Sequence, residues 1–576
     1  MALKITRKAY AEDYGPTTGD SIRLGDTNLW IKIEKDYTVY GDELKYGEGK
    51  SFRDGMGQNS VVTREHPDVM DLIITNVVVL DYTGIYKCDI GVRDGKIAAI
   101  GHAGNPLLQD GVNMIAAVNT ECISGEGLIV TAGGIDTHIH YITPDQCYSA
   151  LQNGVTTHFG GGTGPATGTL ATTCTPGEWY IQRMLVAFDS MPFNVGILGK
   201  GNGAWSETIA EQIRAGASGI KDHEDWSCTR SSLDNSLKAC REYDVQLAIH
   251  TDSLNESGFV EHTEDAIAGR TVHTFHSEGA GGGHAPDIME LTGYDYVIPS
   301  STNPTLPATH DSVPELGDML MFCHHLNPAN PEDVALAKSR IRQQTINAES
   351  VFHDLGIISI VSADSQAMGR AGETVLRTWQ MADSMKKQFG YLEIEGFGKD
   401  SEFNDNLRAK RYVSKYTINA AMVEGVDEYI GSIEVGKYAD LVLWDPKFFG
   451  AKPSLVLKCG MIATALMGDA NASLATCEPI VYKQMFGGLG RAGQEQAITF
   501  VSKYAYEHNV KENLKLQHKV LPCHGASTLK KSDMKWNNWA PKVKVAPRTF
   551  EVTVNGKKIT SVPQAEIALN RLYWLY

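Results

Sequence analysis

The sequence predicts an α/β protein with a (β/α)8 barrel and a smaller β-domain formed from the segments that flank the barrel. Three observations predict it: repeated strand-like runs, β-rich segments on both sides of them, and metal-binding residues at the ends of the runs. We expect barrel strands, separated by helical stretches, at 129–140, 154–160, 193–200, 219–223, 245–250, 271–276, 295–301 and 358–364. Eight such βα units are the number that closes into a parallel barrel.

β-rich segments lie on both sides of the predicted barrel. From Leu72 the chain reads LIITNVVVLDYTGIYKCDIGVRDGKIAAIG, and a matching stretch occupies 431–466. We expect the two segments to pair into one β-domain. The chain then divides into an N-terminal and β-domain part, the barrel, the β-domain return and a mixed C-terminal segment, at 1–132, 133–430, 431–480 and 481–576. The last segment contains FEVTVNGKKIT (550–560), a predicted hairpin with an Asn-Gly turn.

Composition narrows the class of protein. A chain of 576 residues is too long for one hydrophobic core, so two or three domains are expected. A net charge of −17 argues against nucleic acid or an anionic membrane as a partner. Ten cysteines without a CxxC pair are typical of reduced thiols in a cytoplasmic protein. The N-terminus lacks the apolar core of a signal peptide, and we expect no membrane span.

Metal-binding side chains stand at the ends of several predicted strands, where a (β/α)8 barrel carries its chemistry. These residues are His138, His140, Lys221, His250, His276 and Asp364. His138 and His140 are two residues apart on a strand, so both point to one face and can bind one ion. A lone histidine near a strand end is more often a hydrogen-bonded core residue than a ligand. Four imidazoles, a carboxylate and a lysine in this order favour a two-metal site.

Longer motifs around these positions, each improbable by chance, are spread over nearly the whole chain. They are YGPTTGDSIRLGDT (14–27), GGIDTHIH (133–140), GGGTGPATGT (160–169), KDHEDW (221–226), HTFHSEGAGGGHAPD (273–287), MLMFCHHL (319–326), SADSQAMGR (362–370) and MGDANAS (467–473). In these segments the chain resembles the large, catalytic (alpha-type) subunit of the ureases. The HxH at the end of the first barrel strand is similar, more broadly, to that of metal-dependent amidohydrolases.

The resemblance implies that urea is hydrolysed to ammonia and carbamate by a hydroxide that bridges two divalent metal ions. It assigns His138, His140 and Asp364 to one ion and His250 and His276 to the other. Nickel is the usual metal of the family. Nitrogen and oxygen ligands of this kind suit nickel, and the same ligands could hold iron.

Lys221 is implied to bridge both ions as a carbamate formed from carbon dioxide. A cationic ammonium beside two divalent ions is disfavoured by like charge and by desolvation. The neutral amine can add carbon dioxide, which gives an anion with one oxygen for each metal. The alternative is that Lys221 forms an ion pair with Asp222 or Glu224.

The segment 315–342 has the pattern helix, Asn/Pro turn, helix, and it is long for a barrel loop, so it is a candidate lid. Within it, His324 of the FCHHL motif matches the general acid–base histidine of the family. Its neighbour His325 matches no functional residue and is expected to be structural. Cys323 matches a lid cysteine near the site entrance, and we interpret it as a gating residue because the metal hydroxide already supplies the nucleophile.

Three further residues match functional positions of the family. His223 matches the donor of a hydrogen bond to the substrate oxygen. Asp225 and Arg340 match the partners that hold His324 and set its protonation.

The chain departs from the family pattern at several positions near these motifs. Asp222 follows Lys221 where an apolar residue is usual, Ser227 replaces a usual glycine, and Cys228 follows it. His158 stands in GVTTHFGGG in place of an apolar residue. Strand alternation puts Asp222 on the face opposite Lys221, where a cation such as Arg230 could pair with it. These departures bear on the metal identity, the efficiency of carbamylation and the shape of the pocket.

The resemblance also implies partners. Members of the family work with smaller beta- and gamma-type chains, separate or fused, and a trimer of such units is the minimum assembly. Metal insertion in the family uses accessory metallochaperones.

Two other functions remain as alternatives. The first is another amidohydrolase of the hydantoinase or dihydroorotase type, against which MLMFCHHL and GAGGGHAPD argue. The second is a catalytically silent assembly subunit that keeps the fold, against which the complete ligand set and His324 argue.

Overall fold

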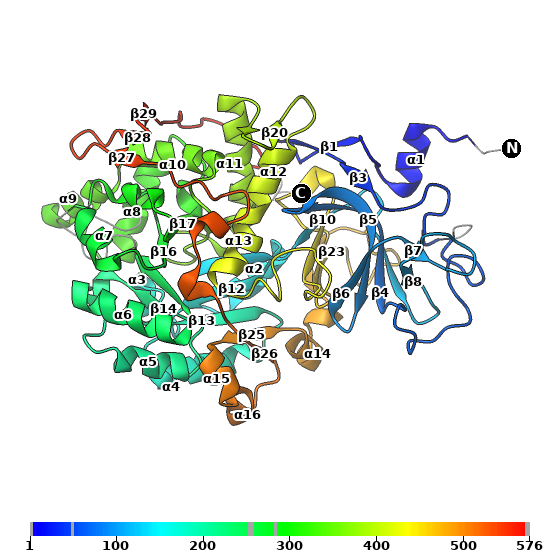
Figure 1. Cartoon of the computed structure of the whole chain (residues 1–576), viewed down its shortest axis with the longest axis horizontal. Coiled ribbons are helices and arrows are strands. Elements are labelled where there is room, and N and C mark those ends of the chain that lie inside the picture. Colours follow the sequence, from blue (N-terminus) through cyan, green and yellow to red (C-terminus); the bar gives the residue numbers. More distant parts are fainter. Residues whose placement is uncertain (1–3, 48–50, 251–258, 281–284, 571–576) are drawn as a thin grey trace.

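The computed structural model describes residues 4–47, 51–250, 259–280 and 285–570. Figure 1 shows a barrel surrounded by helices at one end of the molecule and a β-rich part at the other. Most of the N-terminal strands lie in the β-rich part, and the barrel follows them in the chain. Among the described residues, no helix is both long and apolar enough to cross a membrane.

Eight parallel strands form the barrel, and they follow one another in chain order from β11 to β18. They are β11 (Gly134–His140), β12 (Val155–Gly161), β13 (Asn194–Lys200), β14 (Gly219–Asp222), β15 (Gln246–His250), β16 (Val272–Phe275), β17 (Val297–Thr302) and β18 (Ile360–Ser362). The backbone N–H of Asp364 donates to His138 O at 2.9 Å, which joins the last strand to the first. The predicted (β/α)8 barrel is therefore confirmed.

The first predicted strand, 129–140, is wrong as a single element. It consists of β10 (Ile129–Ala132), which belongs to the β-domain sheet, and β11 of the barrel. Gly133 lies between them and donates its N–H to Asp440 O at 2.8 Å. A Cβ at Gly133 would lie 2.3 Å from Thr156 Oγ1, so only glycine allows the chain to pass this closely from one sheet to the other.

Helices follow most barrel strands and cover the outside of the barrel. They include α2 (Asp145–Gln152), α4 (Gly177–Phe188), α5 (Glu207–Arg214), α6 (Arg230–Tyr243), α7 (Glu261–Ile267), α10 (Gln343–Leu355), α11 (Thr374–Phe389) and α12 (Asn406–Val413). Helix α6 shows how the sequence sets the ends: Thr229 and Ser232 form a capping box, and Asp244 ends the helix in the left-handed region. Its buried residues recur at helical spacing, at Leu233, Leu237 and Cys240.

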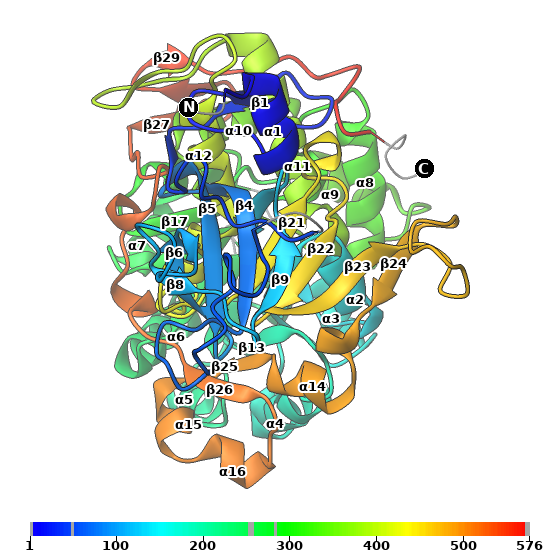
Figure 2. The ribbon, with the colours of Figure 1, turned by 90° about the vertical axis from the view of Figure 1, so that its right-hand side faces the viewer.

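The two β-rich segments that flank the barrel form one sheet, as predicted. Its strands include β4 (Leu72–Asp81), β5 (Gly84–Arg93), β6 (Lys96–Gly101), β9 (Glu121–Ser124), β21 (Leu441–Trp444), β22 (Leu455–Lys458), β23 (Met461–Met467) and β24 (Val481–Gln484). Strand β10 joins the halves, because it pairs with β4 on one side and antiparallel with β21 on the other. Figure 2 shows the later strands, in yellow and orange, beside the blue strands β4 and β5.

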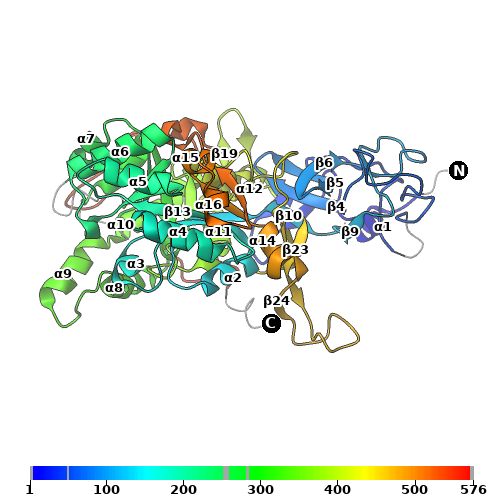
Figure 3. The ribbon, with the colours of Figure 1, turned by 90° about the horizontal axis from the view of Figure 1, so that it is seen from below.

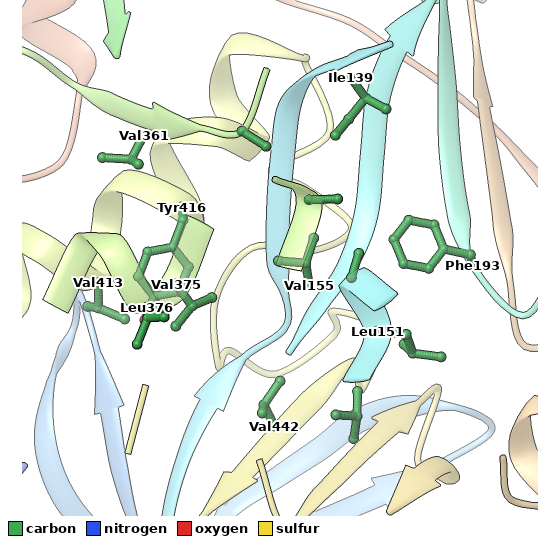
Figure 4. Close-up of a cluster of buried hydrophobic side chains, with 14 of the residues drawn as sticks. Ile139, Leu151, Val155, Phe193, Val361, Val375, Leu376, Val413, Tyr416 and Val442 are labelled. Atoms are coloured by element: carbon green, nitrogen blue, oxygen red, sulfur yellow. The ribbon is translucent and has the colours of Figure 1, made fainter. Parts of the chain in front are cut away.

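A hydrophobic cluster joins the barrel to this sheet. It contains Ile139 of β11, Val155 of β12 and Leu151 of α2, packed in one core with Val442 of β21. Figure 4 shows these four side chains among the buried residues of the cluster. Burial of large apolar side chains is the main favourable term in folding, so this junction ties the two parts together.

The segment 315–342 has the predicted helix–turn–helix form. Helix α8 (Ser312–Cys323) is followed by α9 (Pro331–Arg340), and the two pack against each other. The side chain of Asn330 accepts the N–H of Glu332, and Pro331 occupies the first turn, both of which favour a helix start. Figure 3 shows α8 and α9 at the end of the molecule away from β4 and β5.

The C-terminal segment packs around both parts. Strands β25 (Ile498–Val501) and β26 (Lys519–Pro522) extend the barrel sheet, because β25 pairs in parallel with β13. The predicted hairpin is confirmed: β28 (Val552–Val554) and β29 (Lys557–Lys558) are joined by Asn555 and Gly556, which have φ of 50° and 80°.

Candidate metal centre

The six predicted metal-binding residues meet at the carboxyl end of the barrel. Strands β11, β14 and β15 supply His138, His140, Lys221 and His250, and the turns after β16 and β18 supply His276 and Asp364. Each of these residues is at most 2% exposed. His276 and Asp364 have φ of 47° and 61°. A positive φ is uncommon for residues other than glycine and is found at sites where geometry is imposed by function.

His138, His140 and Asp364 form one compact group. The Nε2 atoms of His138 and His140 lie 3.4 and 3.0 Å from Asp364 Oδ1. A ligand atom from each of the three residues lies within 4.8 Å of the others, close enough to share an ion. His140 Nδ1 is 2.7 Å from Thr169 O, which fixes the proton on Nδ1 and leaves the Nε2 lone pair directed at the group.

His250 and His276 form the second half of the centre. Their ring centroids are 5.2 Å apart. His276 Nε2 lies 3.6 Å from Asp364 Oδ2, and His276 Nδ1 lies 3.3 Å from Thr302 Oγ1. The Asp364 carboxylate therefore stands between both halves, with one oxygen toward each.

Lys221 lies beside both halves with its amine buried. Within the part of the chain that the structure describes, Nζ has no hydrogen-bond partner, and it stands 3.8 Å from the centroid of the Phe275 ring. Burial lowers the pKa of Lys221 to about 7. An ion pair with Asp222 or Glu224, the alternative left open by the sequence, is not among the contacts of these described residues.

Asp222 points away from Lys221, as strand alternation predicts. Its Oδ1 accepts the N–H of Asn202 at 2.7 Å and the hydroxyl of Ser236 at 3.0 Å. The suggested pair with Arg230 is wrong, because Arg230 lies at the outer start of α6 and bonds Asp265 at 2.9 Å instead. Burial raises the pKa of Asp222 to about 6.

Three histidines of the centre, His138, His250 and His276, are held in the neutral form that a metal requires. Burial and then the neighbouring cationic groups lower the pKa of His138 and His250 well below its ordinary value, and burial lowers that of His276 to about 4. Burial alone would raise the pKa of Asp364, but His276 and His140 outweigh it and the pKa is lowered. The group therefore offers neutral imidazoles and a carboxylate without loss of protons.

His223 and His324 lie over the second half of the centre. The ring centroid of His223 is 4.1 Å from that of His250, and the centroid of His324 is 6.3 Å from each of these two. His223 Nδ1 accepts the N–H of Asp225 at 3.1 Å, so a neutral His223 carries its proton on Nε2. Burial lowers the pKa of His223 well below its ordinary value, which makes it a neutral donor.

His324 ends helix α8 and contacts Asp225. Its Nδ1 lies 3.4 Å from Asp225 Oδ1, and its side chain is 8% exposed. Arg340, which was expected near His324, has its guanidinium Nη1 2.6 Å from Glu224 Oε1. The sequence suggested Glu224 only as an alternative ion-pair partner of Lys221, although its place between His223 and Asp225 in KDHEDW could have drawn attention to it.

Cys323 is buried, while His325 is exposed. Cys323 Sγ donates to Leu170 O at 3.5 Å, and burial raises the pKa of its thiol. A protonated thiol is a poor nucleophile. His325 has φ of 55°, and its exposed side chain shares a cleft of about 560 Å³ with His324 and Arg340. Its other lining residues are Thr167, Gly168, Ala171, Thr172, Asp225, Trp226, Leu326 and Leu336.

The other departures from the family pattern have local partners. Ser227 ends the short turn after β14 with φ of 62°. Cys228 Sγ accepts the Ser232 hydroxyl at 3.6 Å. His158 packs against Phe193, with ring centroids 4.4 Å apart. None of these contacts involves a predicted metal-binding residue.

Comparisons with known proteins agree over the whole length of the chain. Residues 129–488 match the Amidohydrolase family, and residues 3–123 match the Urease alpha-subunit, N-terminal domain. The protein named Urease subunit alpha from Clostridium perfringens is 58% identical over 574 residues, covering 100% of this chain and 97% of that protein. Urease subunit alpha from Streptococcus salivarius (strain 57.I) is 55% identical over 577 residues and covers 100% of both chains.

Among solved structures, a dihydropyrimidinase from Brevibacillus agri has a TM-score of 0.46 at 13% identity and covers 68% of this chain and 94% of that chain. The chain belongs to the urease alpha-subunit family, with its barrel in the Amidohydrolase family.

Proposed function

We propose that this chain is the catalytic subunit of a urease and hydrolyses urea to ammonia and carbamate at a centre of two divalent metal ions. The observation that carries the proposal is the buried amine of Lys221, which has no described hydrogen-bond partner and stands among four imidazoles and the Asp364 carboxylate. Burial of an amine without a hydrogen-bond partner costs free energy, and conversion of the lysine to a metal-binding carbamate would remove that cost.

The donor set fits two ions. His138, His140 and Asp364 would hold one, His250 and His276 the other, and a carbamate on Lys221 would bridge them. Neutral nitrogen and anionic oxygen donors suit nickel, which we propose as the metal, and they could also hold iron. When bound, such a pair of ions polarises a carbonyl oxygen and lowers the pKa of a water molecule toward neutrality.

The environment of Lys221 supports the carbamate. With a pKa of about 7, a large fraction of the amine is neutral at neutral pH. The nitrogen lone pair would then attack the carbon of carbon dioxide, so that an N–C bond forms while one C–O π bond breaks toward oxygen, and one proton passes from the nitrogen to water. The product is an anion with two oxygens, which replaces a repulsive cation beside the metals by an attractive charge.

Residues above the centre bind the substrate and move protons. Neutral His223 presents Nε2–H as a donor for the urea oxygen, and Asp225 fixes that tautomer through its backbone N–H. His324 turns Nδ1 to Asp225, so its Nε2 is the nitrogen that would deliver a proton to the leaving ammonia. Arg340 and Cys323 belong to the lid, where we propose that Arg340 supports the acid–base group and Cys323 controls the entrance.

We also propose that the chain works with smaller beta- and gamma-type subunits in the cytoplasm, as at least a trimer of such units, and receives its metals from accessory metallochaperones. Exposed apolar side chains support contact with partners. Leu474, Val481 and Phe486, at and around β24, are 65, 47 and 81% exposed.

A substrate panel tests the proposal. The chain would be produced with its small subunits and accessory proteins, its metals counted, and ammonia release measured from urea and ring opening from hydantoin and dihydroorotate. We expect two metal ions per chain and activity on urea alone. Ring opening of the cyclic amides without urea hydrolysis would favour the hydantoinase type. Loss of both activities with metals absent would favour the assembly subunit.

A further inference from the structure

Glu224 is a buried acid that the steps above do not use. Its side chain is 1% exposed, and Oε1 lies 2.6 Å from Arg340 Nη1 and 3.4 Å from His250 Nε2. Arg340 is the last residue of α9 in the lid, and His250 is the last residue of β15. A single carboxylate oxygen therefore contacts both the lid and one side chain of the proposed metal centre.

The contact between Glu224 and Arg340 is an ion pair that is buried away from solvent. A buried carboxylate is unfavourable unless a cation or hydrogen-bond donors accompany it. Burial alone would raise the pKa of Glu224, but Arg340, His223 and His324 together outweigh burial and the pKa is lowered. Removing Arg340 would take away the cation that lies 2.6 Å from the buried Glu224 carboxylate, so the position of Glu224 depends on Arg340.

Glu224 faces His250 differently from the way the other histidines are held. His140 and His276 have Nδ1 beside Thr169 O and Thr302 Oγ1, and they turn Nε2 toward Asp364. His250 instead turns Nε2 toward Glu224. At 3.4 Å these two atoms form no hydrogen bond with each other, and the carboxylate acts on the ring through its charge, which favours the His250 tautomer with the proton on Nε2.

We propose that Glu224 is a positioning residue that couples the lid to the metal centre. Arg340 holds the carboxylate when α9 is in place, and the charge of the carboxylate favours one orientation and one tautomer of the His250 ring. The inference rests on the proposed function, since it takes His250 as a metal ligand. Displacement of α9 would then weaken metal binding by His250 and His276 more than metal binding by His138, His140 and Asp364.

The test measures metal release and lid opening in the holoenzyme. Wild type, Glu224→Gln and Arg340→Gln would be loaded with nickel and treated with a chelator, and the rate at which each ion is released would be measured. In the same samples, the rate of hydrogen exchange in 331–340 would be measured as the readout of lid opening. In both variants we expect one of the two ions to leave roughly 10–100-fold faster than in wild type, the usual effect of losing a partner of a metal-binding histidine. We also expect faster exchange in α9.

Two controls make the result specific. Asp222→Asn removes a buried carboxylate from the same segment whose bonds go to Asn202 and Ser236, and it should release both ions at the wild-type rate. The double variant Glu224→Gln/Arg340→Gln should release metal no faster than the faster single variant, because both changes break one chain of contacts.

Additive effects in the double variant, equal acceleration of both ions, or wild-type release from both single variants would overturn the coupling. If Glu224→Gln does not fold, Arg340→Gln decides the question from the lid side. Failure of wild type itself to hold two ions would instead overturn the proposed function, and the inference with it.

Discussion

Replacement of His324 by alanine tests the assignment of the acid–base residue. The neighbouring histidines cannot take over as acids, because burial lowers the pKa of His223 and His250 well below the ordinary value and both are neutral. The leaving nitrogen would then depend on water for its proton. We expect turnover to fall by roughly 10²–10⁴-fold, the usual contribution of general acid–base catalysis, or about 3–5 kcal/mol of barrier.

The measurement is steady-state ammonia release, with metals counted in the same samples. Metal content should stay near wild type, because the ring centroid of His324 is 6.3 Å from that of His250 and its described side-chain partner is Asp225. The matched control is His325→Ala, next in the chain but exposed, which should leave turnover near wild type. Equal losses in the two variants, or loss of metal from His324→Ala, would refute the assignment.

Three further predictions follow from the site. Lys221→Ala should lose both metals or nearly all activity, and small carboxylic acids should restore part of it; full metal occupancy with normal turnover in the unsupplemented variant would contradict the bridging role. Cys323→Ala should retain most turnover, because burial keeps the thiol protonated, and should resist inhibition by bulky thiol reagents; inactivation of wild type and variant at one rate would rule out gating at this residue. Protein purified in air and under nitrogen should show the same activity, in proportion to nickel; activity that is lost in air and follows iron would overturn nickel as the metal.

The sequence predicted the barrel because its strands are short runs of β-branched and apolar residues, each followed by a turn. It could not show that 129–140 belongs to two sheets, since the change occurs at Gly133, where the close approach of Thr156 and the bond to Asp440 come from distant parts of the chain. The same limit applies to the suggested pair of Asp222 and Arg230. Strand alternation gave the direction of Asp222 but not its partners, which are Asn202 and Ser236.

The candidate site was predictable in its residues but not in its connections. His138, His140 and Asp364 lie together because strand ends meet at one rim of a barrel, and that follows from the fold. The contact between Glu224 and Arg340 depends on how α9 packs over the rim, and no local pattern indicates it. The roles of these residues remain proposals for the experiments above.

The junction between the first and last strands of the barrel lies beside the proposed metal centre. Strand β11 carries His138 and His140, Asp364 follows β18, and the backbone bond from Asp364 to His138 crosses between them. An ion held by these three residues would cross-link the first and last strands of the barrel sheet. Loading with metal should therefore raise the thermal stability of the protein by linkage, with slowed hydrogen exchange concentrated in 134–140 and 360–365. Metal delivery would then complete the architecture of the enzyme as well as its chemistry.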